Sequence, residues 1–433
     1  MNAYSDSALE ALFTQALLQT LSTGVPGPVL VVPPDLTRIH SRAGLLAGVV
    51  CRVLASPERY GLSPLWRLGG ILPALGTHRP LSDGEIARMF PLCPPRAFIA
   101  HNWRSDTLEL GRLEAEWVKE AFTDPAAGTE EARAFCMDWP VQVNRLLLND
   151  KNALIISIGQ VVPHEVAGMS NHAKNIFIGC GGEEGINKSH WLGALYGLER
   201  IMGISENPVR ALFDEALRRY GGRLAPVLWA LTVVDNDGAA RGLFCGHDRR
   251  CFEDAAALSA NINISRLKKA AQKIVVYLDP AEYRSCWLGN KAVYRSRLAL
   301  ASGGELLILA PALDRFGEDK KIDALIRRSG YRGAGEIRRA VERGDLDILS
   351  AAAHLIHGSS EGRFTIRYCT GPGLSRADIE AAGYQWGNLE EMSARYRYTE
   401  AAGWRATKDG EEFYFIKNPA LGLWTSACRC PLP

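Results

Sequence analysis

The chain has 433 residues, of which 47% are hydrophobic and 23% are charged, and its formal net charge is +2. This length exceeds one typical hydrophobic core and predicts two domains, while the composition is that of an ordinary soluble globular protein. The near balance of charges argues against a broad basic surface for nucleic acid or anionic membranes, and no apolar stretch is long enough to span a membrane.

The first 21 residues carry Asp6 and Glu10 and lack the basic and apolar regions of a signal peptide. We therefore expect an amphipathic helix there and a cytoplasmic protein. Ten cysteines are scattered along the chain, which without an export signal predicts reduced thiols rather than a disulfide framework. Cys428 and Cys430 are closely spaced, but one short pair is little support for a metal site.

Strands and helices are expected to alternate through the first 265 residues. A helical pattern covers residues 43–54, and another helix is expected from Ser82, because Ser82 and Glu85 have the spacing of a capping box. Apolar runs predict strands at residues 29–32, 70–75, 97–100, 153–158, 175–178 and 227–234.

The alternation continues beyond residue 265. We expect a helix over residues 290–302 that stops at Gly303-Gly304 and a later one with Ser375 near its start. Strands are expected at residues 274–278, 306–309 and 364–369. The pattern predicts two α/β domains with mostly parallel sheets, residues 1–265 and 266–433, with an active cleft between them.

Three polar residues follow the strand expected near residues 153–158. His164, Lys174 and His190 are spaced by 10 and 16 residues. Parallel sheets build sites at the carboxyl ends of their strands. Two imidazoles and an amine there suit proton transfer, metal ligation or covalent attachment. The alternative is a glycine-containing loop that happens to hold polar residues.

Two shorter segments also follow predicted strands. Asp35-Leu36-Thr37-Arg38 offers a carboxylate, a hydroxyl and a guanidinium that could hold a phosphate or carboxylate. The alternative is an Asx turn with a surface arginine. Gly76-Thr77-His78-Arg79 places a histidine beside an arginine. Further on, Glu206-Asn207-Pro208 predicts a helix boundary, since the residue before proline is pushed out of the α region.

Taken in order, these segments resemble the nickel-dependent lactate racemase family, which acts on 2-hydroxy acids. The resemblance spans roughly residues 30–215 and is weaker beyond them. The residues that carry it are Asp35-Leu36-Thr37-Arg38, Gly76-Thr77-His78-Arg79, Pro163-His164, Ala167-Gly168, Ser170, Lys174, His190 and Glu206-Asn207-Pro208.

The resemblance implies a cofactor, the nickel pincer nucleotide, which is a nicotinate-derived mononucleotide with sulfur donors. Lys174 would attach it through a thioamide, and His190 would complete a planar nickel site. Asp35, Thr37 and Arg38 would position the cofactor phosphate or the substrate. Enzymes that synthesise the cofactor would then be partners in maturation.

The implied activity is that of a 2-hydroxyacid racemase or epimerase. His78 and His164 would serve as the acid–base pair, one for each face of the substrate, while the cofactor takes and returns a hydride. Arg79 is a further candidate for substrate binding.

The sequence departs from the family pattern in two places. Asn171-His172 stands where paired glycines are usual, and Arg295 stands in place of a glutamine expected to bind the substrate. Lys291, Arg295 or Arg297 could hold the substrate carboxylate, with a solvated basic helix face as the alternative, and Trp386 is the aromatic residue carried over. Lys291 and Arg295 are four residues apart on one helix face, which favours a dicarboxylate or a sugar acid over lactate.

Two other classes of function remain open from the residues. One is a zinc-dependent hydrolase or lyase that uses His164, His172 and His190, although no His-Glu-x-x-His segment is present. The other is a family member that binds the cofactor or a nucleotide without turnover. This alternative is suggested by Asn171-His172 and Arg295, where the sequence departs from the family pattern.

Overall fold

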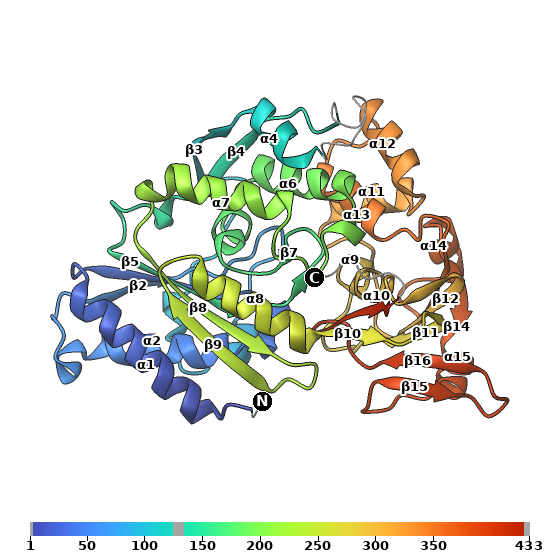
Figure 1. Cartoon of the computed structure of the whole chain (residues 1–433), viewed down its shortest axis with the longest axis horizontal. Coiled ribbons are helices and arrows are strands. Elements are labelled where there is room, and N and C mark those ends of the chain that lie inside the picture. The colour runs from blue at the N-terminus through green and yellow to red at the C-terminus, as the bar shows by residue number, and fades with distance from the viewer. Residues whose placement is uncertain (1–2, 124–133, 428–433) are drawn as a thin grey trace. The chain divides into compact units, whose positions relative to one another are not determined.

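The computed structural model describes residues 3–123 and 134–427 (Figure 1). It divides into two compact units, which are described separately here. The first contains Met1–Ser189 and Ile204–Asn263, and the second contains His190–Gly203 and Ile264–Pro433. Both are mixed α/β structures with mainly parallel sheets.

The first unit is built on a five-stranded sheet of order β2-β1-β5-β8-β9. The first four strands run parallel, and β9 is antiparallel to β8. The strands are β1 (Pro28–Val32), β2 (Arg67–Ile71), β5 (Leu154–Gln160), β8 (Val227–Val234) and β9 (Ala240–Gly246). β5 is buried along its whole length, as expected for a central parallel strand with both faces covered.

Helices cover both faces of this sheet. Helices α1 (Asp6–Thr23) and α2 (Ala43–Ala55) share one hydrophobic core with alternate residues of β1, β5 and β8. α8 (Arg250–Asn263) packs on β8 and β9, as Figure 1 shows. The remaining elements are α3 (Asp83–Met89), α4 (Ala115–Phe122), α6 (Glu183–Tyr196), α7 (Pro208–Tyr220) and the two-stranded pair β3 (Thr107–Leu113) and β4 (Trp139–Asn144).

The second unit has a six-stranded sheet of order β14-β13-β12-β11-β16-β15, parallel except for the β15–β16 pair. Its strands are β11 (Ala271–Tyr277), β12 (Leu300–Ala310), β13 (Thr365–Thr370), β14 (Gln385–Asn388), β15 (Gly403–Ala406) and β16 (Glu412–Ile416). A separate parallel pair joins β10 (Ile264–Leu267) to β17 (Leu423–Ser426). The helices are α9 (Cys286–Gly289), α10 (Lys291–Ser296), α11 (Lys320–Ser329), α12 (Ala334–Glu342), α13 (Leu349–His357), α14 (Arg376–Ala381) and α15 (Leu389–Arg395).

Most predicted elements are present. The helices at the start of the chain, over residues 43–54 and after Ser375 are confirmed, and Ser82 and Glu85 form the predicted capping box. The strands expected at residues 29–32, 153–158, 227–234, 274–278, 306–309 and 364–369 are found, and β2 lies partly within residues 70–75. Within the described part of the chain, no helix is long and apolar enough to cross a membrane. Cys428 and Cys430 lie outside the described residues.

Two strand predictions in the first unit are wrong. Residues 97–100 are not a strand, because the prolines before them start the 3₁₀ turn Pro95–Ala97, and only Phe98 forms an isolated bridge, to Ile71. Residues 175–178 belong to the buried helical turn Asn175–Gly179. A short apolar run without periodicity does not distinguish a strand from a buried helical turn.

The helix predicted over residues 290–302 is also wrong in its extent. α10 ends at Ser296, and β12 starts at Leu300 and runs through both glycines. Gly303 has φ +77°, and the pairing of β11 with β12 shifts register there. The glycine pair therefore forms a β-bulge rather than a helix stop.

Candidate active site

The site residues of the first unit follow three neighbouring parallel strands. Asp35 comes after β1, His78 after β2, and His164 and Lys174 after β5, and these strands are adjacent in the order β2-β1-β5. The carboxyl ends of parallel strands lie at one edge of a sheet, so the topology brings the four segments to the same edge.

The Asp35 turn is fixed by its own side chain. One carboxylate oxygen accepts hydrogen bonds from the Thr37 amide (3.1 Å) and the Thr37 hydroxyl (2.6 Å). Asp35 thereby caps the 3₁₀ helix Leu36–Ser41 and is only 6% exposed. The Asx turn considered as the alternative to a binding loop is present, and it leaves the second carboxylate oxygen available for another partner.

That second oxygen binds His78. The Nδ1 atom of His78 is hydrogen-bonded to Oδ2 of Asp35. A bridge between Pro34 and Ala74 aligns the two loops, and Gly76, at φ +55°, donates its amide to the Gly179 carbonyl (2.8 Å). A carboxylate accepts only, so Nδ1 carries the proton and Nε2 of the neutral ring is left as a proton acceptor.

His164 has the opposite hydrogen-bond pattern. It lies in the short hairpin of β6 (Pro163–His164) and β7 (Gly168–Met169), where its Nδ1 accepts from the amides of Val166 (3.1 Å) and Ala167 (3.4 Å). The Glu165 carboxylate is 3.9 Å from the same nitrogen, which is too far for a hydrogen bond. Because Nδ1 is an acceptor, the proton of the neutral ring is on Nε2.

Asn207 and Gly168 hold this hairpin in place. The Asn207 side chain caps α7 and donates to the carbonyls of Ala167 (3.2 Å) and Ile204 (2.9 Å), so the predicted helix boundary also supports the His164 loop. Gly168 has φ +72°, and a Cβ there would lie 1.8 Å from the Ile204 carbonyl oxygen. Only glycine fits this position.

The segment from Ser170 to Lys174 contains the departure from paired glycines. Asn171 and His172 have φ values of 71° and 56°, in the left-handed region that glycine adopts readily and other residues rarely. Arg210, which is fully buried, donates to the carbonyls of Met169 and Asn171 (3.1 Å for the latter) and so holds the strained backbone.

The His172 ring points into an aromatic pocket. Its centroid lies 4.3 Å from that of Trp229 and 5.4 Å from that of Phe252. Burial, and next the charge of Arg210, lower the pKa of His172 to about 3. The ring is therefore neutral at physiological pH and serves as a packing group, which gives no support to a zinc site containing His172.

Lys174 ends the same segment, and its environment favours the neutral amine. Desolvation lowers the pKa of Lys174 to about 8, and Arg38 adds to this effect, while Glu165 and Asp35 oppose it. Roughly a tenth of such an amine is unprotonated at pH 7, far more than for an ordinary lysine. Because Arg38, Asp35 and Glu165 all affect the pKa of Lys174, their charged groups lie close enough to the Lys174 amine to interact with it electrostatically.

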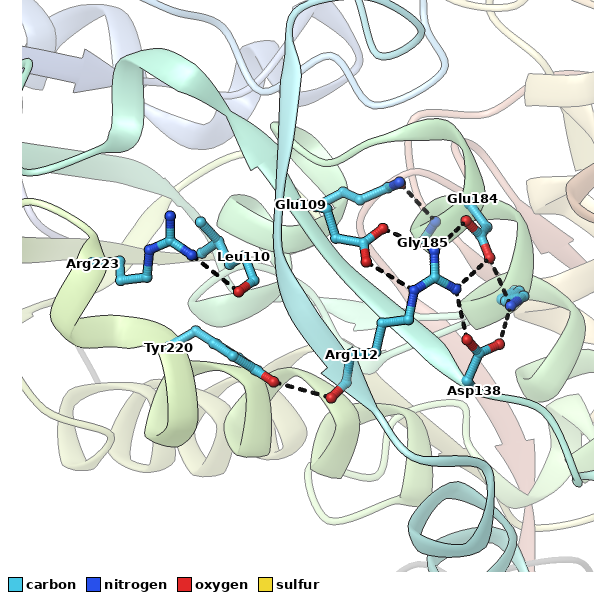
Figure 2. Close-up of polar contacts among 10 residues, drawn as sticks. Glu109, Leu110, Arg112, Asp138, Glu184, Gly185, Tyr220 and Arg223 are labelled. Atoms are coloured by element: carbon cyan, nitrogen blue, oxygen red, sulfur yellow. Dashed lines mark hydrogen bonds and ion pairs between the residues drawn. The ribbon is translucent and has the colours of Figure 1, made fainter.

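The first half of α6 is tied firmly to the β3–β4 pair. Figure 2 shows the Arg112 guanidinium among the carboxylates of Glu109, Glu184 and Asp138, with Arg112 to Asp138 at 2.6 Å. Trp139 also donates to the Gly185 carbonyl at 2.8 Å. His190 lies further along the same helix, in the portion that belongs to the second unit.

Most of the substrate candidates contact other groups of the protein. Arg79 is 58% exposed at its side chain and forms a two-point pair with Glu85 (2.9 and 2.5 Å). In the second unit, Arg295 is fully buried and donates to the Gly422 carbonyl (3.1 Å). Arg297 pairs with Glu199 (3.1 Å). Lys291 begins α10, and Trp386 lies on β14 with the Arg376 guanidinium 5.9 Å from its ring centre.

Sequence reasoning missed Arg210 and Glu165. Arg210 lies in the first turn of α7, close to Asn207 and Pro208, and no motif in the sequence marks it. Glu165 directly follows His164, and its carboxylate raises the pKa of Lys174. Among the described residues, no group of three or more His, Cys, Asp or Glu side chains is arranged to hold a metal ion.

The first unit is an α/β structure in which His78, His164 and Lys174 lie in segments that follow adjacent parallel strands. Residues 136–199 match the family model of the lactate racemase N-terminal domain. The fold is similar to that of the lactate racemase apoprotein from Thermoanaerobacterium thermosaccharolyticum, with a TM-score of 0.65, 16% identity, and coverage of 96% of this chain and 92% of that one. Residues 136–199 are thus similar to the lactate racemase N-terminal domain, and the chain as a whole shares the fold of the lactate racemase apoprotein.

A protein from Thermotoga maritima, known from its crystal structure, has the same fold. Its TM-score is 0.81 at 22% identity, with 98% of this chain and 99% of that chain covered. No curated protein matches the sequence significantly.

Proposed function

We propose that this chain is a 2-hydroxyacid racemase or epimerase that works with a nickel pincer nucleotide. The observation that carries the proposal is the complementary hydrogen bonding of two histidines. Nδ1 of His78 donates to Asp35, whereas Nδ1 of His164 accepts from backbone amides. One ring therefore offers an acceptor at Nε2 and the other a donor at Nε2.

This arrangement suits opposite roles at a hydroxyl and a carbonyl. His78 would take the substrate hydroxyl proton at Nε2, and Asp35 would stabilise the imidazolium that forms. His164 would donate its Nε2–H to the oxygen of the 2-keto acid, as a neutral electrophilic imidazole does. The reverse exchange of roles would complete racemisation or epimerisation.

Lys174, Arg38, Asp35 and Thr37 of the first unit have side chains whose chemistry suits this cofactor, and the family resemblance adds His190, which belongs to the second unit. Lys174 would attach it, because a partly buried amine with a pKa of about 8 is already a nucleophile near neutral pH. Arg38 and the Asp35–Thr37 turn would hold the phosphate, and His190 would provide the protein ligand to nickel. When bound, the cofactor supplies a hydride acceptor and donor for the substrate α-carbon.

The test is to produce the chain together with the cofactor-synthesis enzymes and to measure metal content, intact mass and turnover. To measure turnover, the enzyme is incubated with a panel of 2-hydroxy acids in deuterated water. Chiral chromatography then gives the configuration of each product, and mass spectrometry gives its deuterium content. Hydride return predicts inversion without deuterium at the α-carbon. Inversion with deuterium at that carbon, or zinc in place of nickel, would overturn the proposal.

A second candidate is a member that binds the cofactor without turnover. It is favoured by Asn171 and His172, since two bulky residues stand in the left-handed backbone before Lys174. The same experiment separates the two candidates. Nickel and added mass without inversion of any acid in the panel would support this second reading.

A further inference from the structure

Cys51 and Cys93 form a thiol pair that none of the site chemistry uses. Cys51 lies on α2, and Cys93 lies in the segment Pro91-Leu92-Cys93-Pro94 that follows α3. Both are free cysteines that border the same groove, and their mutual interaction shifts the pKa of Cys51 down and that of Cys93 up. They are 42 positions apart in sequence, so the pair is made by the packing of α2 and not by a local motif.

The pair lines an open groove. A cavity of about 580 Å³ is bordered by Cys51, Arg52, Leu54, Ala55, Leu68, Pro91, Leu92, Cys93 and Pro94. Cys51 is partly exposed, whereas Cys93 is only 6% exposed and is packed into the hydrophobic core. Cys51 is therefore the more accessible of the two thiols to a small reagent in the groove.

We propose that Cys51 and Cys93 are a redox site that a small hydroperoxide converts to a disulfide, with Cys51 as the attacking thiol and Cys93 as the resolving thiol. The sulfur of Cys51 would attack the peroxide, forming an S–O bond as the O–O bond breaks and water or an alcohol leaves. The sulfur of Cys93 would then attack that of Cys51, forming the S–S bond as the S–O bond breaks and a second water leaves. The peroxide takes the two electrons lost by the thiols.

The local chemistry favours this order of attack. The hydrogen bond from Cys93 lowers the pKa of Cys51, while the same contact and burial raise the pKa of Cys93. The thiolate is the reactive form, so nucleophilic character is concentrated on the more accessible sulfur.

The backbone around Cys93 also favours formation of a Cys51–Cys93 disulfide bond. Pro91 and Pro94 restrict the segment that presents Cys93, and the Cys93 amide is held by the Phe90 carbonyl (3.0 Å). Formation of the disulfide requires the two sulfurs to come within about 2.05 Å of each other. The bond would close a loop of the chain that contains His78 and Arg79.

The chain provides its own matched control in Cys245 and Cys251. These thiols are also near each other, but burial raises the pKa of each to about 12. Hydrogen peroxide titration of the full chain, with peptide mapping under non-reducing conditions, would compare the two pairs directly. The apoprotein suffices, so the outcome is independent of the proposed racemase activity.

We expect a Cys51–Cys93 linked peptide, two hydrogens lighter than its reduced parts and restored by dithiothreitol, with Cys51 consumed at least about tenfold faster than Cys245. Cys93→Ser should stop the reaction at a Cys51 sulfenic acid that dimedone traps, whereas Cys51→Ser should leave Cys93 unmodified. Replacing the exposed Cys136 by serine removes a competing thiol. Failure of the linked peptide to form, or equal rates at Cys51 and Cys245, would overturn the proposal.

Discussion

Asp35 and His78, from loops that follow two adjacent parallel strands, share a hydrogen bond between Oδ2 and Nδ1. The opposite carboxylate oxygen is held by the amide and hydroxyl of Thr37. Asp35 thus has one oxygen that orders its own turn and one that fixes the tautomer of a histidine. Because the two oxygens have separate partners, an isosteric replacement of Asp35 can test the role of the carboxylate.

Asp35→Asn should lower kcat by roughly 10²–10⁴-fold if His78 is the base. The asparagine oxygen can still accept from Thr37, but its amide cannot accept from Nδ1 of His78, so the ring would change tautomer. Steady-state kinetics and circular dichroism of the loaded enzyme are the measurements. Thr37→Val is the comparison: it removes the hydroxyl bond to Asp35 and leaves the contact with His78 intact, so its effect should fall on cofactor content and far less on kcat of the loaded enzyme. Equal losses in both variants would count against the base assignment.

Lys174 should titrate near pH 8, and its neighbours should move that value in known directions. Removing the positive charge with Arg38→Gln should raise the pKa of Lys174, and Asp35→Asn should lower it, because the first charge disfavours the ammonium and the second favours it. Acylation rates of the Lys174 peptide as a function of pH, read by mass spectrometry of the apoprotein, provide the check. A midpoint near 10.5 in all three proteins would contradict the environment described.

The same pKa has a consequence for stability. The pKa of Lys174 is lower in the folded state than in the unfolded state. The buried ammonium therefore destabilises the folded protein fully below about pH 8, and this destabilisation decreases as the pH rises toward 10.5. Lys174→Met should therefore stabilise the apoprotein at pH 7, by roughly 1–2 kcal/mol, and this gain should shrink at pH 10. Urea unfolding at the two pH values is the test, and a gain independent of pH would refute the explanation.

The sequence predicted the central strands of both sheets, and it missed other elements and several contacts for physical reasons. β5 and β8 were predictable because buried parallel strands are continuous apolar runs. Residues 175–178 have the same appearance, yet Asn175 donates to the Ser157 hydroxyl (3.0 Å) and turns the chain into a helical turn. A contact of that kind depends on tertiary structure and leaves no periodicity in the sequence.

The candidate site was predictable to a similar degree. Strand ends identified Asp35, His78, His164 and Lys174, because parallel topology alone brings such residues to one edge. The anchoring by Arg210 was not predictable, since it requires the loop carbonyls of Met169 and Asn171 to face α7. For the same reason, the sequence could not reveal that His172 is a packing residue.

His172 should make the apoprotein less stable in acid. Its folded pKa of about 3 lies below the ordinary value of 6.5, so the unfolded state binds more protons between these values. The stability contribution is complete above pH 6.5 and is lost as the pH falls, by about 1.4 kcal/mol per pH unit. His172→Leu, which keeps an apolar group between Trp229 and Phe252, should remove this dependence in unfolding measured at pH 7.5 and pH 5. An unchanged slope would show that other groups cause it.

The last prediction concerns the substrate and the arginine that replaces a glutamine. Arg295 is fully buried on α10 and donates to the Gly422 carbonyl, and a guanidinium can bind a carboxylate through two parallel hydrogen bonds. We expect 2-hydroxy dicarboxylates or sugar acids to be turned over faster than lactate, and Arg295→Gln to lower kcat/KM for them by about tenfold or more relative to lactate. Arg297→Gln is the matched control: Arg297 is bound to Glu199, so its loss should reduce thermal stability without changing substrate preference. Chiral chromatography of the acid panel, with melting temperatures for each variant, distinguishes the two effects. Fastest turnover on lactate, unaffected by Arg295→Gln, would contradict the prediction.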